Sequence, residues 1–365
     1  MRRAGNEDNQ QLPMLRLLLD VTALMRLQRT GVAVYVRELA AAMARRNDVE
    51  LRPVWRPSRW RRRRLIAHHL SIPPRPFLPI VGRLAGDIYH GPDFRIPSRG
   101  LLPRIVTIHD LVVFEENLVD ARFALEGRER TTKTIRRNRP DGILVVSSFT
   151  RDRLCEHFPE VEQIVRVTYP GIDHRLFTVG SRSVGGPPFL LAAGSIEKRK
   201  NLERTIRAFE RVHSLRPDLR LIVAGGDGHD AVRIRARARE SSACRAITFV
   251  GYVDDRDLVE LYRSAEMLLY PSLYEGFGLP VVEAMACGCP VLTSNRGAMA
   301  EVGGVAAVTV DPEDTDEIAQ GIMSILDQDG LRADLIRRGI ERSASYTWDR
   351  CADDTMAAYR ETGGR

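Results

Sequence analysis

The sequence predicts an α/β protein built from two doubly wound, Rossmann-like domains that face each other across a cleft. Three observations support this fold class. The chain has 365 residues, which is enough for two domains at about 100 to 200 residues each. Short, continuously apolar runs alternate with segments of helical period, as in parallel sheets that are covered by helices on both faces. A turn-rich passage near the middle of the chain separates two such series.

The first domain is expected over residues 1–180. Its first strand is Leu15 to Asp20, and a helix with one apolar face follows over Val32 to Met43. The Pro-rich stretch Ile72 to Pro79 is expected to be a loop. Further short strands are expected at residues 88–90, 104–109 and 142–147.

The turn-rich passage from Tyr169 to Pro188 is the expected linker, and the second domain is expected over residues 181–345. In open α/β sheets, ligands bind outside the carboxyl ends of the strands, so the cleft between the domains is the expected site. The expected strands are 189–193, 219–224, 247–250, 267–270, 290–293 and 308–310, and the expected helices are 201–215, 255–265, 280–287 and 314–327.

Composition excludes several classes of protein. Charged residues make up 28% of the chain and apolar residues 44%, which does not describe a disordered or collagen-like chain. No stretch approaches the ~20 apolar residues of a membrane span, and the polar start, Met1 to Pro13, lacks the apolar core of a signal peptide. We therefore expect a cytoplasmic protein. Its five cysteines are expected to be reduced thiols that fill core space: Cys155, Cys244, Cys287, Cys289 and Cys351.

Positive charge is concentrated in the first half. Residues 1–180 hold 31 Lys+Arg and 20 Asp+Glu, whereas residues 181–365 hold 24 and 28. The densest basic segment runs from Arg52 to Arg64 and includes Trp55 and Trp60. This mixture suits the headgroup layer of an anionic membrane, and a solvated Arg-rich loop is the alternative. Nucleic-acid binding also fits basic residues mixed with aromatics, but we expect no nucleic-acid partner.

The most informative passage is residues 274–290, which read YEGFGLPVVEAMACGCP. A strand is expected to end just before it, and a helix to begin at Pro280, because proline favours the first turn of a helix. Gly276 and Gly278 expose backbone N–H groups ahead of the helix N-terminus, which suits a phosphate. A plain glycine turn is the alternative interpretation.

Two glutamates eight positions apart, Glu275 and Glu283, lie in this passage. It resembles the signature of the retaining glycosyltransferases of GT-B fold, the large group-1 family. The resemblance implies that Glu275 approaches the hydroxyl groups of the donor sugar and that Glu283 holds the ribose of the nucleotide. It also places the donor diphosphate on the loop between them: Gly276, Phe277, Gly278 and Leu279.

A second passage, residues 193–202, reads AGSIEKRKNL and places a glycine turn and three cations between a strand and a helix. Arg and Lys beside a helix N-terminus suit a diphosphate. Cations near the positive N-terminal end of a helix are electrostatically unfavourable unless an anion binds there, which indicates an anion site. The alternative interpretation is a helix that begins with basic residues and binds no ligand. The resemblance implies that Arg199 and Lys200 neutralise the leaving nucleoside diphosphate, with Gly194 also at the donor.

In the first domain, two residues match positions of the family. Gly31 follows the first strand and opens a helix, like the glycine-bearing loop that covers the donor phosphates; a plain helix-start turn is the alternative. His109 ends a strand in the passage VTIHD, residues 106–110. A lone His at a strand end is often structural, but its position in the family implies contact with the donor sugar. Asp110 either orients the imidazole or caps the following turn.

The resemblance extends from about Leu15 to Tyr359. It places Tyr252 and Val253 in the turn that faces the nucleotide base, mainly through backbone atoms. The last helix resembles the family's C-terminal helix, so residues 346–365 are expected to cross back onto the first domain. Residues 255–257 read DRD, like a metal-binding Asp-x-Asp, but acidic residues are also expected at a helix start. Because Arg199 and Lys200 can replace a metal, we expect no metal and no cofactor.

The resemblance therefore implies a retaining glycosyltransferase that moves a sugar from a nucleoside diphosphate donor to a saccharide or lipid-linked acceptor, in polysaccharide or glycolipid synthesis. Residues 19–24 and 29–31 resemble bacterial mannosyl- and rhamnosyltransferases of surface polysaccharides, which favours a GDP-sugar of mannose type. A lipid-linked acceptor would explain membrane contact through Arg52 to Arg64, on the inner face of the cell membrane. The alternatives are a catalytically silent scaffold and a sugar-nucleotide epimerase or phosphorylase on the same architecture.

Overall fold

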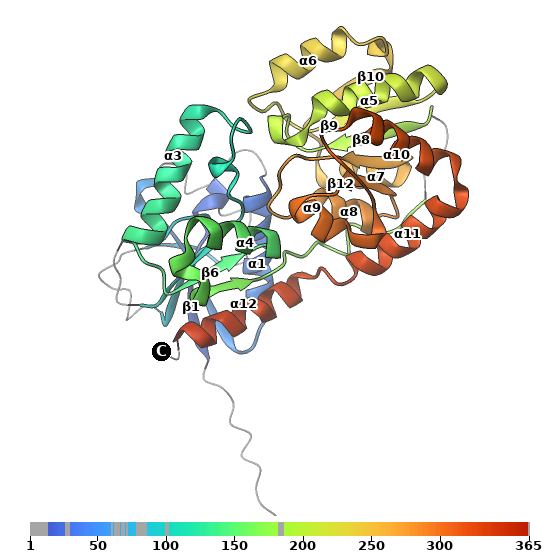
Figure 1. The fold of residues 1–365 in the computed structure, drawn as a ribbon. Helices are drawn as coiled ribbons and strands as arrows, with labels where there is room; N and C mark the ends of the chain where they lie inside the picture. The colour runs from blue at the N-terminus through green and yellow to red at the C-terminus, as the bar shows by residue number, and fades with distance from the viewer. Residues whose placement is uncertain are drawn as a thin grey trace, which may run out of the picture.

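The computed structural model contains two α/β units, each built around one parallel sheet (Figure 1). All strand pairings in the two sheets are parallel among the residues that the structure describes. This arrangement confirms the predicted fold class. The described residues are 14–25, 30–59, 61, 66, 70, 72–77, 86–98, 102–181 and 186–363.

The first sheet has seven strands in the order β3-β2-β1-β4-β5-β6-β7. The interior strand β1 buries Leu17, Leu18 and Leu19, and Leu17 lies between Leu51 of β2 and Ile88 of β4. The strands are β1 (Leu15–Asp20), β2 (Val49–Trp55), β3 (Arg75–Pro76), β4 (Ile88–Gly91), β5 (Arg104–Ile108), β6 (Gly142–Val145) and β7 (Val165–Val167). The helices are α1 (Gly31–Ala44), α3 (Ala121–Thr132), which continues as a π-helical turn over Lys133–Arg137, and α4 (Ser148–His157).

The second sheet has six strands in the order β10-β9-β8-β11-β12-β13. They are β8 (Phe189–Ala193), β9 (Arg220–Ala224), β10 (Ile247–Gly251), β11 (Met267–Tyr270), β12 (Val291–Ser294) and β13 (Val308–Val310). The helices are α5 (Leu202–Leu215), α6 (Ala231–Arg239), α7 (Asp255–Ser264), α8 (Leu279–Ala286), α9 (Gly297–Gly303), α10 (Thr315–Asp327) and α11 (Asp329–Ser343).

The last helix, α12 (Trp348–Gly363), packs against α1 and β6 of the first unit (Figure 1). The two connections between the units run side by side, because Ile172 forms a parallel bridge with Thr347 and its N–H donates to the Tyr346 carbonyl at 3.1 Å. Buried Ile172, Phe177 and Trp348 belong to an apolar cluster that includes residues of both units. The chain thus crosses between the units twice at one place, and apolar packing joins the units there.

Several elements differ from the predictions. The sequence analysis did not predict β2, which contains Pro53, a residue that is unfavourable inside a paired strand. Among the described residues, β3 pairs with β2 only at Val54 and Trp55. Within this part of the chain, Pro53 therefore faces an unpaired edge of β2, where a missing N–H is tolerated. The stretch Ile72 to Pro79 was predicted to be a loop and contains β3, a two-residue edge strand in which Pro is tolerated. Strand β7 and helices α3, α4, α6, α9 and α11 were also not predicted.

The prediction of core-filling thiols is correct for Cys287, Cys289 and Cys351, which are buried and free. It is wrong for Cys244, which is exposed, and Cys155 is half-buried. No helix in the described part of the chain is both long and apolar enough to span a membrane.

A buried histidine links α12 to the first sheet. His90 of β4 is fully buried, with Nδ1 2.6 Å from the Tyr359 hydroxyl and Nε2 2.7 Å from Oγ1 of Thr107. Burial lowers the pKa of His90 to about 3. The ring is therefore neutral in the folded protein at neutral pH.

We expect the free energy of unfolding to fall as the pH drops below 6.5. In this range the unfolded chain binds a proton at His90, whereas the ring stays neutral in the folded protein until the pH approaches its pKa of about 3. Across this window one such group costs about 1.4 kcal/mol per pH unit. Urea unfolding at pH 7 and pH 5 should show that wild type loses about 2 kcal/mol more than His90→Gln, which cannot titrate. Equal losses in the two proteins would contradict this account.

Candidate active site at the domain interface

The loop between β8 and α5 carries the cations singled out in the sequence. Gly194 directly follows β8, and its N–H donates to the end of β9 at 2.8 Å. A 3-10 turn, Lys198–Lys200, leads into α5 through Asn201, whose φ of 59° lies in the left-handed region. The Asn201 side-chain amide donates to the carbonyls of Pro271 at 2.9 Å and Pro312 at 2.6 Å. Asn201 therefore fixes this loop against the segments that follow β11 and β13.

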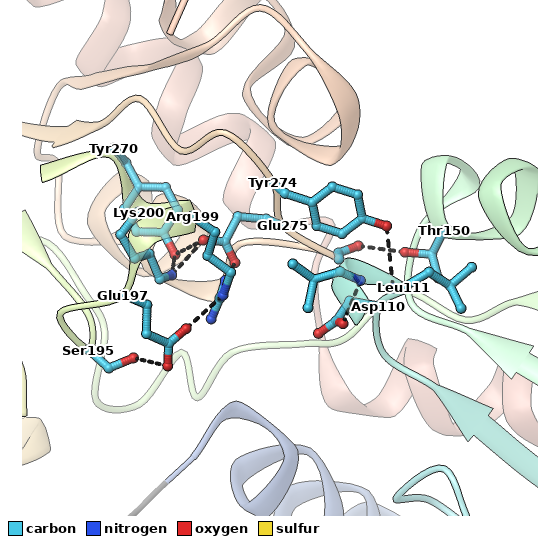
Figure 2. Close-up of polar contacts among 12 residues, drawn as sticks. Asp110, Leu111, Thr150, Ser195, Glu197, Arg199, Lys200, Tyr270, Tyr274 and Glu275 are labelled. Carbon is cyan, nitrogen blue, oxygen red and sulfur yellow. Dashed lines mark hydrogen bonds and ion pairs between the residues drawn. The ribbon is translucent and has the colours of Figure 1, made fainter. Parts of the chain in front are cut away.

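A buried ion cluster forms where this loop meets Glu275 (Figure 2). Nη1 of Arg199 lies 2.5 Å from Oε2 of Glu275, and Nζ of Lys200 lies 2.6 Å from Oε1. The Tyr270 hydroxyl donates to Oε1 of Glu275 at 3.2 Å and accepts from Lys200. Glu197 holds the other side of Arg199, with 2.7 Å from Nε to Oε2. The side chains of Lys200 and Glu275 are 9% and 8% exposed, so this cluster is screened little by solvent.

Burial and charge act in opposite directions in the cluster. Burial raises the pKa of Glu275, but Arg199 and Lys200 outweigh it and hold that pKa below its usual value. Burial lowers the pKa of Lys200, although Glu275 opposes the change. The pKa of Arg199 is raised, because Glu275 and Glu197 outweigh its burial. An additional anion beside Lys200 would therefore favour its charged form.

The cations already have anionic partners, which the sequence analysis did not foresee. It expected an incoming anion to balance Arg199 and Lys200, whereas Glu275 and Glu197 occupy them in this structure. Both oxygens of Glu275 are engaged by the cations. A ligand anion at this site therefore competes with a carboxylate.

The segment after Glu275 packs closely against the first unit. A Cβ atom on Gly276 would lie 1.8 Å from the carbonyl oxygen of His109. The Gly276 carbonyl accepts from Oγ of Ser147 at 2.6 Å. It also accepts from Oγ1 of Thr150 at 3.1 Å (Figure 2). The absence of a side chain at Gly276 therefore allows the loop that bears Glu275 to touch the end of β5.

Helix α8 begins at Leu279, one residue before the predicted start. It follows Gly278, whose φ of 102° is a conformation that favours glycine. In the first turn of α8, Pro280 has no N–H and the Val281 N–H donates to the Gly278 carbonyl at 3.0 Å. The Leu279 N–H is therefore the group that can face an anion. The Phe277 side chain is buried, with its ring centroid 5.4 Å from that of Tyr346, so its backbone is the part that can face a ligand.

His109 lies at the same contact between the units. Its Nε2 donates to the Pro92 carbonyl at 2.8 Å, and its ring centroid lies 4.9 Å from that of Tyr35. Burial lowers the pKa of His109 to about 4, so the ring is neutral at pH 7 and Nδ1 is its acceptor nitrogen. Asp110 accepts from the Val112 N–H at 3.1 Å, so it caps the following turn rather than orienting the imidazole.

Glu283 lines a different part of the interface. It is buried on α8 and accepts from the Tyr262 hydroxyl at 3.2 Å. A cavity of about 210 Å³ has Glu283, Leu279 and Asp255 on the second unit and Val34 on α1 of the first. Glu283 and the first turn of α8 therefore share one cavity between the units.

The other residues predicted to bind the donor do not line this cavity. Gly31 is the exposed first residue of α1, which is capped by the side chain of Thr30. Tyr252 is 59% exposed and Val253 is half-buried. The Asp-x-Asp stretch begins α7, as predicted for a helix start. In the described part of the chain, no group of three or more His, Cys, Asp or Glu is placed to hold a metal ion.

Glu301 makes a contact between the units that the sequence analysis missed. Its carboxylate accepts from the N–H groups of Ser148 at 2.9 Å and Phe149 at 3.0 Å, in the first turn of α4. It also accepts from the Tyr169 hydroxyl at 2.6 Å. A carboxylate at a helix N-terminus is favourable, but no local pattern in the sequence pairs α9 with α4.

Comparisons with known proteins agree with this architecture. The family model described as "Glycosyl transferases group 1" matches residues 178–342, and the one described as "Glycosyltransferase Family 4" matches residues 29–176. The O-antigen chain mannosyltransferase B of Escherichia coli is 30% identical over 75% of this chain and 74% of that protein.

Two solved structures share the fold. Sucrose-phosphate synthase from Thermosynechococcus elongatus superposes with a TM-score of 0.75 at 20% identity, over 95% of this chain and 98% of that one. Anabaena HepE, solved in complex with UDP and glucose, gives a TM-score of 0.73 at 14% identity, over 95% and 100%.

We expect Gly276→Ala to separate the two units, because its Cβ would overlap the His109 carbonyl. The free energy of unfolding should fall by about 1–3 kcal/mol, as for other overpacked sites, and the radius of gyration from small-angle scattering should rise. Gly226→Ala is the matched control, since its Cβ would meet nothing within 4 Å. An unchanged radius of gyration in Gly276→Ala would show that the contact does not hold the units together.

Proposed function

Because the chain belongs to the group 1 glycosyltransferases, we propose that it transfers a sugar from a nucleoside diphosphate donor to a saccharide or lipid-linked acceptor, with retention of configuration and without a metal. The observation that carries this proposal is the buried cluster of Arg199, Lys200 and Glu275 beside His109 of the other unit. Two cations at the start of a helix suit a departing diphosphate, which they stabilise electrostatically.

The donor would lie with its diphosphate between Arg199, Lys200 and the Leu279 N–H at the start of α8. As the phosphate takes the cations, the carboxylate of Glu275 is released and can accept from hydroxyl groups of the donor sugar. Glu283 would bind the ribose from the cavity it lines, with the base beside Tyr252 and Val253. The neutral ring of His109 would face the sugar from the first unit.

In the transfer step, the bond between the anomeric carbon and the leaving phosphate oxygen breaks, and a bond to the acceptor oxygen forms on the same face. The acceptor hydroxyl gives its proton to the departing phosphate. Arg199 and Lys200 stabilise the negative charge that develops on that phosphate, and the two units hold donor and acceptor in position. No metal is needed because the two cations offset this charge.

A mannose-type GDP-sugar is the donor we propose, in the synthesis of a surface polysaccharide. The name of the Escherichia coli relative, an O-antigen chain mannosyltransferase, supports this choice. The segments 19–24 and 29–31 support it as well, although residues 26–29 lie outside the described residues.

Calorimetric titration of GDP, UDP, ADP and their sugar conjugates, with EDTA present, tests the donor site. We expect one nucleotide to bind saturably, and Lys200→Met to weaken it at least tenfold, because a charge-assisted contact to phosphate is lost. Lys198→Met is the matched control on the same turn, since Lys198 is exposed. Absence of binding by every nucleotide would refute the glycosyltransferase proposal and favour a catalytically silent scaffold.

We also propose a cytoplasmic protein that contacts an anionic membrane through the segment Arg52 to Arg64. Part of this segment faces inward: Trp55 is buried, and Arg56 pairs with Asp20 at 2.7 Å. Arg59 and Arg61 are exposed, whereas Trp60 and residues 62–65 lie outside the described residues. The exposed arginines are therefore the part of the segment available to lipid.

Liposome flotation tests the membrane proposal. Binding should increase with the fraction of anionic lipid, and replacing Arg61 to Arg64 by Ser should reduce it more than tenfold, since each basic residue near such a surface contributes about 1 kcal/mol. The control removes four exposed arginines of the second unit: Arg220, Arg239, Arg245 and Arg256. Equal flotation of both variants would refute contact through this segment.

A further inference from the structure

Among the residues that the structure describes, the half-buried arginines form a hydrogen bond or an ion pair through their side chains, with two exceptions. Arg16 pairs with Asp87, Arg56 with Asp20 and Arg153 with Glu115. In the part of the chain that the structure describes, Arg95 and Arg130 are the half-buried arginines whose side chains have no hydrogen bond or ion pair. Partial burial of a charge without a partner is unfavourable. This exception points to a partner that the chain itself does not supply.

The two arginines lie on segments that are bonded to each other. Arg95 follows Phe94, whose carbonyl accepts from Oγ1 of Thr134 at 3.0 Å. Arg130 is on α3, and Thr134 lies four residues later in the π-helical turn that continues this helix, so the two residues are about one turn apart. The hydrogen bond from Thr134 therefore brings Arg130 to the loop that bears Arg95 (α3 is labelled in Figure 1).

This loop also borders the predicted active site. Pro92 accepts from Nε2 of His109 at 2.8 Å, and the Phe94 ring centroid lies 5.6 Å from that of His109. Phe94 has a φ of 66°, in the left-handed region that non-glycine residues rarely adopt. Its N–H donates to the Thr107 carbonyl at 3.2 Å, which helps to hold it there. Such local strain occurs preferentially at ligand-binding sites.

Positive charge exceeds negative charge around Arg95. Residues 51–100 contain eleven Arg and two Asp, and no Glu. Both aspartates are used, since Asp87 pairs with Arg16 and Asp93 with Arg56. The parts of residues 26–101 that lie outside the described residues contain no Asp or Glu. Asp93 also acts on Arg95 at longer range, but its ion pair is with Arg56, so Arg95 shares a carboxylate that already has a partner.

The electrostatics of Arg95 agree with this count. Burial lowers its pKa, and Asp93 opposes that change. Arg56, Arg130 and Arg59 lower the pKa further, because they are like charges. Arg59 is exposed and also has no ion pair among the described residues. Two guanidinium groups without an ion pair in the described chain, those of Arg130 and Arg59, thus act on Arg95, which follows the Phe94 that contacts His109.

We propose that Arg95 and Arg130, with Arg59 at the exposed rim, bind a phosphate or diphosphate group of the acceptor. This inference rests on the proposed function, because it assigns the loop that contacts His109 through Pro92 and Phe94 to the molecule that receives the sugar. Guanidinium groups bind phosphate through paired hydrogen bonds. The acceptor is therefore a phosphorylated saccharide, and the anion fixes which of its hydroxyl groups reaches the donor.

The first test is calorimetric titration of inorganic phosphate into Lys200→Met, in which the donor site is weakened. Adding Arg95→Gln and Arg130→Gln to this variant should weaken phosphate binding at least tenfold, as expected for the loss of charge-assisted hydrogen bonds. The matched control adds Arg239→Gln and Arg245→Gln, two exposed arginines of the second unit, and should leave the affinity unchanged. The same titrations in wild type saturated with nucleoside diphosphate provide a second measurement if Lys200→Met does not fold.

Unfolding without phosphate separates a binding role from a structural one. Because no ion pair of the described chain is lost, removal of Arg95 and Arg130 should leave the midpoint of urea unfolding unchanged or raise it. Phosphate should raise the midpoint of wild type more than that of the double variant. Retained phosphate affinity in the double variant, or a lowered midpoint without phosphate, would overturn the proposal.

Competition against inorganic phosphate identifies the source of the anion. One experiment uses a saccharide linked to polyprenyl diphosphate in neutral micelles, and the other uses a water-soluble sugar phosphate. The acceptor site is supported if either compound competes with phosphate in wild type but not in the double variant. Competition by neither would overturn it. If nucleotide binds but phosphate does not, the acceptor site is refuted and the proposed glycosyltransferase function stands. If phosphate binds at Arg95 and Arg130 but no nucleotide binds, the proposed function is refuted and these arginines form an anion site of another kind.

Discussion

The burial of the Glu275 carboxylate is the interaction on which the rest of the site depends. A buried carboxylate is costly unless it is paired, and here Arg199, Lys200 and Tyr270 compensate it from two different loops. Burial lowers the pKa of Lys200, and the same pairing with Glu275 opposes that change. Removal of any member would leave an uncompensated group, so these ion pairs help to hold the loops after β8 and β11 together, beside the hydrogen bond from the Leu273 N–H to the Arg199 carbonyl at 2.8 Å. Asn201 adds hydrogen bonds between the same two segments.

The contact between the units begins one residue after this carboxylate. Gly276 touches His109 and accepts from Ser147 and Thr150, so the charge state of Glu275 and the position of the first unit are linked through one peptide bond. Glu301 adds a second connection, with its carboxylate on the N-terminus of α4. Both contacts place polar groups of the second unit against the ends of β5 and β6. The interface is therefore specific, and it brings His109 to the loop of Glu275.

The sequence predicted the parts of the fold that have strong local signals. The buried strand β11 is continuously apolar, β1 has an apolar run over Leu17 to Leu19, and the glycine-rich passage at 274–290 identifies the start of α8. Strands β2 and β3 were missed because proline is a negative signal whose effect depends on which edge of the strand is paired. The pairing of Glu275 with Arg199 and Lys200, and of Glu301 with α4, could not be predicted, because each joins residues that are distant in the sequence. The sequence suggested which side chains carry the chemistry, whereas their partners follow from the fold.

The ion cluster also constrains how a diphosphate can bind. In the structure, Arg199 and Lys200 are balanced by Glu275 and Glu197. A diphosphate adds negative charge to a site in which Glu275 is already ionised, and like charges in a poorly screened environment repel strongly. The favourable outcome is an exchange of partners, in which the phosphate forms ion pairs with Arg199 and Lys200 and the Glu275 carboxylate accepts hydrogen bonds from neutral hydroxyl groups. Gly276 directly follows Glu275, so a rotation of the Glu275 side chain acts on the loop that contacts His109. Binding of an anion to Arg199 and Lys200 is therefore coupled to the position of the first unit relative to the second.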